Sequence, residues 1–94
     1  MDAGDMFAEA DQLSTELEGI SFLAIQGMVD RELVKSSHAA VFNDAWNNLE
    51  NYTEDLRRRT NYPQQREHFE QFAKECQDWL AKRGRRTIVG RDRQ

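Results

Sequence analysis

The first thirty residues of this 94-residue chain contain no lysine or arginine, and the whole chain has one proline, one cysteine and five glycines. Strands and hairpins need frequent turn residues, so this scarcity favours long helices. A single cysteine excludes a framework of intrachain disulfides and fits a reducing compartment. No apolar run reaches the roughly 20 residues that span a bilayer. The acidic N-terminal segment also lacks the basic and apolar parts of a secretory signal, and we therefore expect a cytoplasmic protein without membrane contacts.

The residues that are present indicate one small folded domain. Apolar residues make up 38% of the chain and charged residues 32%, and nine aromatic side chains are too many for a disordered polyelectrolyte. A chain of this length builds one modest core without an elaborate internal pocket. We expect a helical domain over residues 1–84 and a basic, flexible tail over residues 85–94.

Apolar spacing predicts an all-α fold of three helices, which pack antiparallel because the connections between them are short. The predicted helices cover residues 3–35, 38–60 and 63–84. Ser36 or Ser37, in the turn between the first two helices, is expected to cap the start of the second helix, and Gly84 is expected to end the third. In an alternative with four helices, Gly19 breaks the first one.

Each predicted helix carries an apolar stripe that we expect to face the core. On the first helix the stripe alternates intervals of four and three residues, as in a heptad seam, and consists of Met6, Ala10, Leu13, Leu17, Ile20 and Ala24. On the second it consists of Phe42, Ala45, Leu49, Tyr52 and Leu56, with Trp46 beside it. On the third it consists of Phe69, Phe72, Cys76, Trp79 and Arg83. Cys76 is therefore predicted to be a small buried hydrophobic residue.

The segment ISFLAIQGMV, residues 20–29, is apolar at seven of its ten positions. On a helix, one side would carry Ile20, Ala24 and Met28, and nearly the opposite side would carry Phe22, Ile25 and Val29. A helix at the edge of a small bundle needs an apolar arc of only a little over a third of its circumference. Either other helices enclose this segment, or one of its faces meets another chain.

This excess of apolar surface leads to a functional hypothesis. We expect a non-enzymatic, acidic, helical protein-binding module, such as an adaptor, inhibitor or neutralising protein, that binds a protein partner or forms a homodimer. The predicted anchors are Ile20, Phe22, Ile25 and Val29, with Met6 and Phe7 as secondary contacts. Three carboxylates are expected to steer the partner: Asp2, Asp5 and Glu9.

Two alternatives remain open. Residues 82–94 carry six basic residues and one acidic residue, so a nucleic acid could be bound there through Arg83, Arg85, Arg86, Arg91 and Arg93. Residues 1–81 oppose this, because their 16 acidic and seven basic residues would repel a phosphate backbone. The other alternative is a structural subunit of a larger helical assembly.

Motifs for catalysis and for metal or cofactor binding are missing from the sequence. It contains no CxxC, HExxH or ExxH spacing, and no glycine-rich loop that follows a strand. Nothing in it indicates a serine, cysteine or threonine that is oriented by a base. The sequence therefore predicts no enzymatic activity, no cofactor and no metal.

Overall fold

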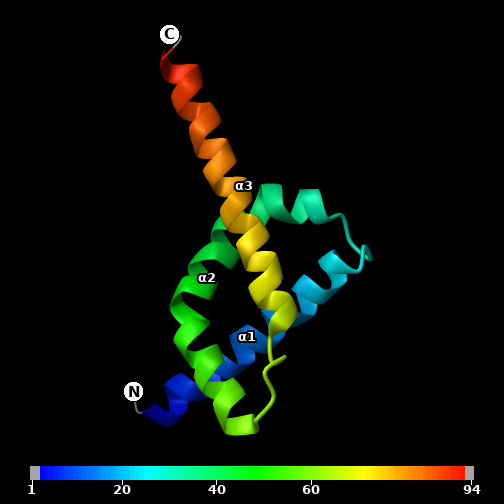
Figure 1. Cartoon of the computed structure of the whole chain (residues 1–94), viewed down its shortest axis with the longest axis vertical. Coiled ribbons are helices and arrows are strands. Elements are labelled where there is room, and N and C mark those ends of the chain that lie inside the picture. Colours follow the sequence, from blue (N-terminus) through cyan, green and yellow to red (C-terminus); the bar gives the residue numbers. More distant parts are fainter. Residues whose placement is uncertain (1–2, 93–94) are drawn as a thin grey trace.

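Three helices, as many as predicted, make up the part of the chain that the structure describes: α1 (Ala3–Ile25), α2 (Arg31–Thr60) and α3 (Glu67–Asp92). The computed structural model describes the backbone of residues 3–92 and the side chains of residues 7–83, and within that backbone every regular element is helical. Helices α2 and α3 run in opposite directions, and α1 crosses this pair obliquely (Figure 1). The all-α class is thus confirmed, but the helix boundaries differ from those predicted.

The first helix ends ten residues earlier than predicted, because the chain turns at Gly27. This glycine has a φ of 78°, a left-handed conformation that only glycine adopts without steric cost. Its N–H donates to the carbonyl of Ala24 at 3.2 Å, and the N–H of Met28 donates to the carbonyl of Leu23 at 2.9 Å. These two bonds form a Schellman motif, which closes the end of α1. Gly19 lies inside α1, so the four-helix alternative is not confirmed.

Helix α2 begins at Arg31 rather than after the predicted turn at Ser36 and Ser37. The side chain of Asp30 accepts a hydrogen bond from the N–H of Leu33 at 3.1 Å and caps the new helix. Both serines lie within α2, where each hydroxyl donates to the carbonyl of Leu33, at 3.0 and 2.8 Å. Serine favours helix starts, but its hydroxyl can equally bond back to the preceding turn.

The second turn also differs from the prediction. Asn61 ends α2 with a φ of 55°, and the N–H of Tyr62 donates to the carbonyl of Arg57 at 3.1 Å, which completes a second Schellman motif. Arg66, with a φ of 60°, lies directly before α3, which starts at Glu67 and not at residue 63. The helix continues through Gly84, so neither the predicted end at that glycine nor the basic tail is confirmed.

The core lies where α2 and α3 face each other. Its buried side chains on these helices are Ala39, Phe42, Trp46, Leu49, Phe69, Phe72, Ala73 and Cys76. Two edge-to-face ring pairs join the helices: the centroids of Phe42 and Phe72 are 5.0 Å apart, and those of Trp46 and Phe69 are 5.4 Å apart. The predicted stripes thus supply part of the core, through Phe42 and Leu49 on the second helix and Phe69, Phe72 and Cys76 on the third. The last member of the third stripe, Arg83, is exposed instead.

Helix α1 presents a different face to the core from the one predicted. Its buried side chains are Ser14, Leu17, Ser21 and Ala24. These four residues are spaced by three and four residues, as the predicted seam is. Two members of the predicted seam, Leu13 and Ile20, instead face solvent, with exposed fractions of 44% and 43%. The prediction was wrong at these two positions, because buried serines take the places that leucine and isoleucine were expected to fill.

Arg66 explains part of this orientation, since it ties the start of α3 to α1. Its Nε donates to the Oγ of Ser14 at 3.0 Å, and its Nη2 donates to Asp11 at 3.1 Å and to Thr15 at 2.9 Å. The Tyr52 hydroxyl of α2 donates to the same Asp11 oxygen at 2.8 Å. Burial, assisted by this bond, raises the pKa of Tyr52 to about 12. All three helical segments thus meet at one polar cluster.

Glu18 makes a second polar link between α1 and α3. Its Oε1 accepts a hydrogen bond from the backbone N–H of Phe69 at 2.8 Å, and its Oε2 lies 2.6 Å from Nδ1 of His68. The first N–H groups of a helix have no partner within the helix, so a carboxylate from α1 here acts as a cap for α3. Glu18 and Arg66 together fix which face of α1 turns inward.

Candidate protein-docking surface

Large apolar side chains are exposed mainly on α1 and the turn after it. Ten large hydrophobic side chains are exposed in the part of the chain whose side chains are described, and seven of them lie in residues 7–29. They are Phe7, Leu13, Ile20, Phe22, Leu23, Met28 and Val29. Single exposed apolar side chains are ordinary, whereas a contiguous group is typical of a surface that contacts another molecule.

Four of these exposed residues are grouped under the name α1 strip: Leu13, Ile20 and Leu23 on α1, and Met28 in the turn after it. Leu13 and Ile20 are seven residues apart, and Leu23 follows three residues later, so a helix places all three on one face. Met28 lies in the turn after the helix, where its N–H donates to the Leu23 carbonyl at 2.9 Å, and this Schellman bond places the residue at the end of the row. The exposed fractions of the last two, Leu23 and Met28, are 38% and 69%.

Carboxylates lie within the same row. Glu9 and Glu16 are both exposed, and together with the strip they give the series 9, 13, 16, 20, 23, with intervals of four and three residues. Glu16 accepts a hydrogen bond at 3.3 Å from Gln12, one turn earlier on α1. Glu9, which was predicted to steer a partner, thus lies beside the exposed apolar surface.

The four predicted anchors are divided between surfaces. Ile20 belongs to the α1 strip. Phe22 is exposed but faces α3, where its ring packs edge-on against His68 with the centroids 5.1 Å apart. Val29 is exposed in the turn, while Ile25 is partly buried against the core. Only the first of the four lies on the strip, and Ile25 is not part of the exposed surface.

Phe7 lies near the other end of α1 and packs within the molecule. Its ring meets Tyr52 edge-on at 5.2 Å, and the Arg59 guanidinium lies 5.5 Å from its centroid. Three further predicted contacts have side chains that lie outside the described residues: Asp2, Asp5 and Met6. The described part of the docking surface is therefore the α1 strip with its two carboxylates.

The predicted nucleic-acid contacts are described only at Arg83. Its guanidinium lies 5.2 Å from the centroid of the Trp79 ring, a cation–π contact within α3. Arg85, Arg86 and Arg91 belong to α3, but their side chains lie outside the described residues, as does the whole of Arg93.

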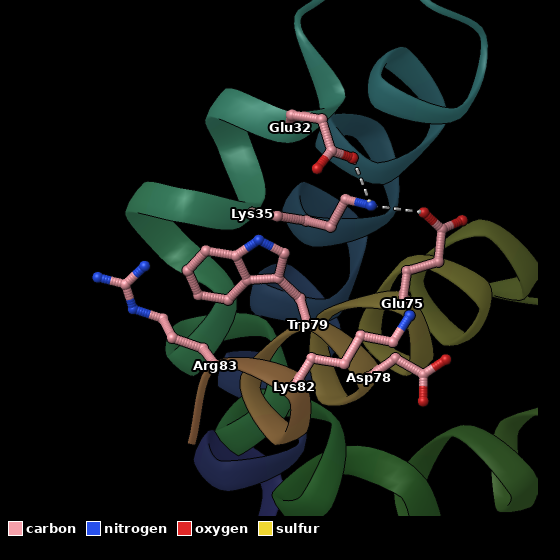
Figure 2. A pocket seen from close by; sticks show the side chains of 7 residues that line it. All are labelled: Glu32, Lys35, Glu75, Asp78, Trp79, Lys82 and Arg83. Atoms are coloured by element: carbon pink, nitrogen blue, oxygen red, sulfur yellow. Dashed lines mark hydrogen bonds and ion pairs between the residues drawn. The ribbon is translucent and has the colours of Figure 1, made fainter. Parts of the chain in front are cut away.

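A charged hollow of about 410 Å³ lies between the start of α2 and the middle of α3 (Figure 2). It is lined by Glu32, Lys35, Glu75, Asp78, Trp79, Lys82 and Arg83. Lys35 forms ion pairs with Glu32 at 2.8 Å and with Glu75 at 3.4 Å, and the bond to Glu32 is the main reason that the pKa of Lys35 is raised. Three acidic and three basic side chains surround one indole, so the hollow favours neither sign of charge.

Sequence reasoning missed Leu23 and Met28 and assigned Leu13 to the core. The spacing itself contained a second seam, 13, 16, 20 and 23, that runs parallel to the one chosen. A second signal was the pair of serines, Ser14 and Ser21, because small side chains seven residues apart allow close helix contact. In the structure the seam with Ser14 and Ser21 is buried, and the seam with Leu13, Ile20 and Leu23 is exposed to solvent.

Within residues 7–83 no group of three or more histidine, cysteine, aspartate or glutamate side chains is arranged to hold a metal ion. Cys76 is fully buried, as predicted, and burial raises its pKa to about 11.

The buried thiol of Cys76 gives a direct test of the core. We expect native protein at pH 8 to react with a thiol reagent such as DTNB at least about a thousandfold more slowly than unfolded protein, because reaction requires global opening against several kcal/mol. The absorbance change has one source, since the chain has one cysteine. Rapid labelling of the native protein would show that α3 opens locally at Cys76.

These features define a small all-α protein of three helices with an exposed apolar and acidic strip on α1. None of the helices within residues 3–92 is long and apolar enough to cross a membrane. The chain belongs to the family described as domain of unknown function DUF4760, whose model matches residues 6–79. No curated protein and no solved structure matches the chain. The matched region includes the whole α1 strip and the polar cluster around Arg66.

Proposed function

We propose that this protein is a non-enzymatic protein-binding module that uses the α1 strip as its docking surface. The observation that carries the proposal is the exposure of four large apolar side chains in one row, on a chain with a mean hydropathy of −0.89. Interface anchors are typically large apolar side chains at the centre of a patch with a polar rim. Glu9 and Glu16 supply part of such a rim.

The setting of the strip favours a preformed surface. The opposite face of α1 is held by Arg66 and by Glu18, each of which bonds across to another segment. A rigid helix loses little conformational freedom when it binds, so more of the contact energy remains as affinity. The buried, unpaired Cys76 fits a reducing compartment, and we place the activity in the cytoplasm.

The test removes apolar surface without adding charge. A double variant, Leu23→Gln and Met28→Gln, is compared with Tyr62→Gln, which changes an exposed aromatic residue in the α2–α3 connection. Proteins recovered from a lysate of the source organism are identified by mass spectrometry, and the affinity of each purified candidate is measured. We expect the double variant to bind a specific partner with at least about tenfold lower affinity, the loss expected when two anchors are removed.

Stability separates a binding defect from a folding defect. Both variants change exposed positions, so their thermal midpoints should stay within a few degrees of the parent. Recovery of the same partners at the same affinity by parent and double variant would contradict the proposal.

Nucleic-acid binding through the C-terminal segment is the alternative proposal, and it rests on the six basic residues in residues 82–94. Deletion of residues 85–94 separates the two. The alternative requires loss of salt-sensitive DNA or RNA binding, whereas the docking proposal expects partner affinity to be retained.

A further inference from the structure

We infer that the occupant of the α1 strip is an amphipathic helix of a partner protein that carries lysine or arginine beside its apolar seam. This inference rests on the proposed function and adds the shape and the charge of the partner. It follows from the spacing of the row, from the charges along it and from the way α1 pairs its other carboxylates.

The spacing of the row fits a helix. The positions 9, 13, 16, 20 and 23 alternate four- and three-residue intervals, which is the repeat that lets two helices stay in contact along a seam. From Leu13 to Leu23 the helix rises by about 15 Å, so a partner needs about three turns to cover it.

The charges of α1 exclude a second copy of the same helix as the favoured occupant. Residues 1–30 contain seven acidic residues and no lysine or arginine. Two copies of α1 packed through their strips would therefore bring carboxylates together without any cation between them. Like charges across an interface are costly, and opposite charges select the partner.

On its inner side, α1 already pairs carboxylates with nitrogen groups of the rest of the protein. Asp11 lies 3.1 Å from an Arg66 guanidinium nitrogen, and Glu18 lies 2.6 Å from a ring nitrogen of His68. On the outer side, no lysine or arginine within the described residues 7–83 pairs with Glu9 or Glu16. A basic helix seated on the strip would supply those cations.

Three synthetic peptides of about 20 residues serve as probes. All share one leucine seam, and the positions beside the seam are lysine in the first peptide, glutamate in the second and glutamine in the third. Fluorescence anisotropy with the full-length protein gives each dissociation constant at 50 and 300 mM salt. We expect the lysine peptide to bind at least about tenfold more tightly than the glutamate peptide at low salt, and the ratio to shrink at high salt.

A charge swap tests whether the preference comes from the strip. The variant Glu9→Lys/Glu16→Lys should bind the glutamate peptide more tightly than the lysine peptide, the reverse of the parent's order of affinity. The control, Glu50→Lys/Glu54→Lys, alters net charge equally at two exposed positions of α2 and should keep the parent's order. Reversal by both variants to the same extent would mean non-specific attraction and would overturn the inference.

Other results separate this inference from the proposed function. Equal binding of all three peptides, lost in Leu23→Gln/Met28→Gln, would keep the docking surface but overturn a basic partner. A concentration-dependent dimer of the parent protein, abolished by the same double variant, would make a second copy the occupant. If no peptide binds, no dimer forms and the double variant retains its cellular partners, both the inference and the proposed function are wrong.

Discussion

Replacing Arg66 with alanine is expected to lower the free energy of unfolding by about 2–3 kcal/mol, the range for charged hydrogen bonds that become unpaired in a mostly buried site. The side chain is only 12% exposed and donates to Ser14, Asp11 and Thr15 of α1. Its loss removes the cation beside Asp11 and a donor to a fully buried hydroxyl. Chemical denaturation followed by circular dichroism measures the change.

Arg66→Gly separates the side-chain bonds from the backbone conformation. Arg66 has a φ of 60°, in the left-handed region that costs residues with a Cβ roughly 1 kcal/mol or more. Glycine lacks this cost, so Arg66→Gly should be more stable than Arg66→Ala by about 0.5–1 kcal/mol, although both lose the bonds to α1. Equal stability of the two variants would show that φ here is not held in the left-handed region.

Arg58→Ala is the matched control for Arg66→Ala. The side chain of Arg58 is 73% exposed and pairs with Asp55 on its own helix at 3.2 Å. Exposed ion pairs within a helix contribute about 0.5 kcal/mol or less, so this variant should be nearly neutral. A loss at Arg66 no larger than the loss at Arg58 would contradict a structural role for the Arg66 contacts with α1.

Local sequence patterns predicted the buried face of the third helix, although not its ends. Phe69, Phe72 and Cys76 were placed on the core stripe, and all three are fully buried. On this helix the bulky apolar residues occupy one face and charged residues occupy the other, so only one orientation buries the apolar side. The second helix behaved similarly, with Phe42 and Trp46 in the core.

The same reasoning was wrong for the first helix because its sequence allows two orientations. One seam contains Leu13 and Ile20, and the other contains Ser14 and Ser21. Hydrophobicity alone favours the first. The second is buried because Arg66 bonds to Ser14 and because Glu18, on the same side of α1, caps α3. These partners lie about fifty residues away in the chain, beyond any periodicity within one helix.

Replacing Phe72 with alanine should lower the free energy of unfolding by about 3–5 kcal/mol, more than the loss expected for Arg66→Ala. Phe72 is 0% exposed and its ring packs edge-on against Phe42 of α2 at 5.0 Å. Truncation removes apolar area and leaves a cavity between the two helices that form the core. Domains of this size have about 5–15 kcal/mol of stability in total. The thermal midpoint should therefore fall by about 15–30 °C.

Phe7→Ala removes the same atoms from a different environment and serves as the control. Phe7 is 40% exposed, and its ring lies against Tyr52 and beneath the Arg59 guanidinium. Because water already contacts much of this ring and no closed cavity remains, we expect a loss of about 1 kcal/mol. If Phe72→Ala loses at least about three times as much unfolding free energy as Phe7→Ala, the core lies at the α2–α3 contact. Equal losses would mean that Phe72 is not enclosed between the helices.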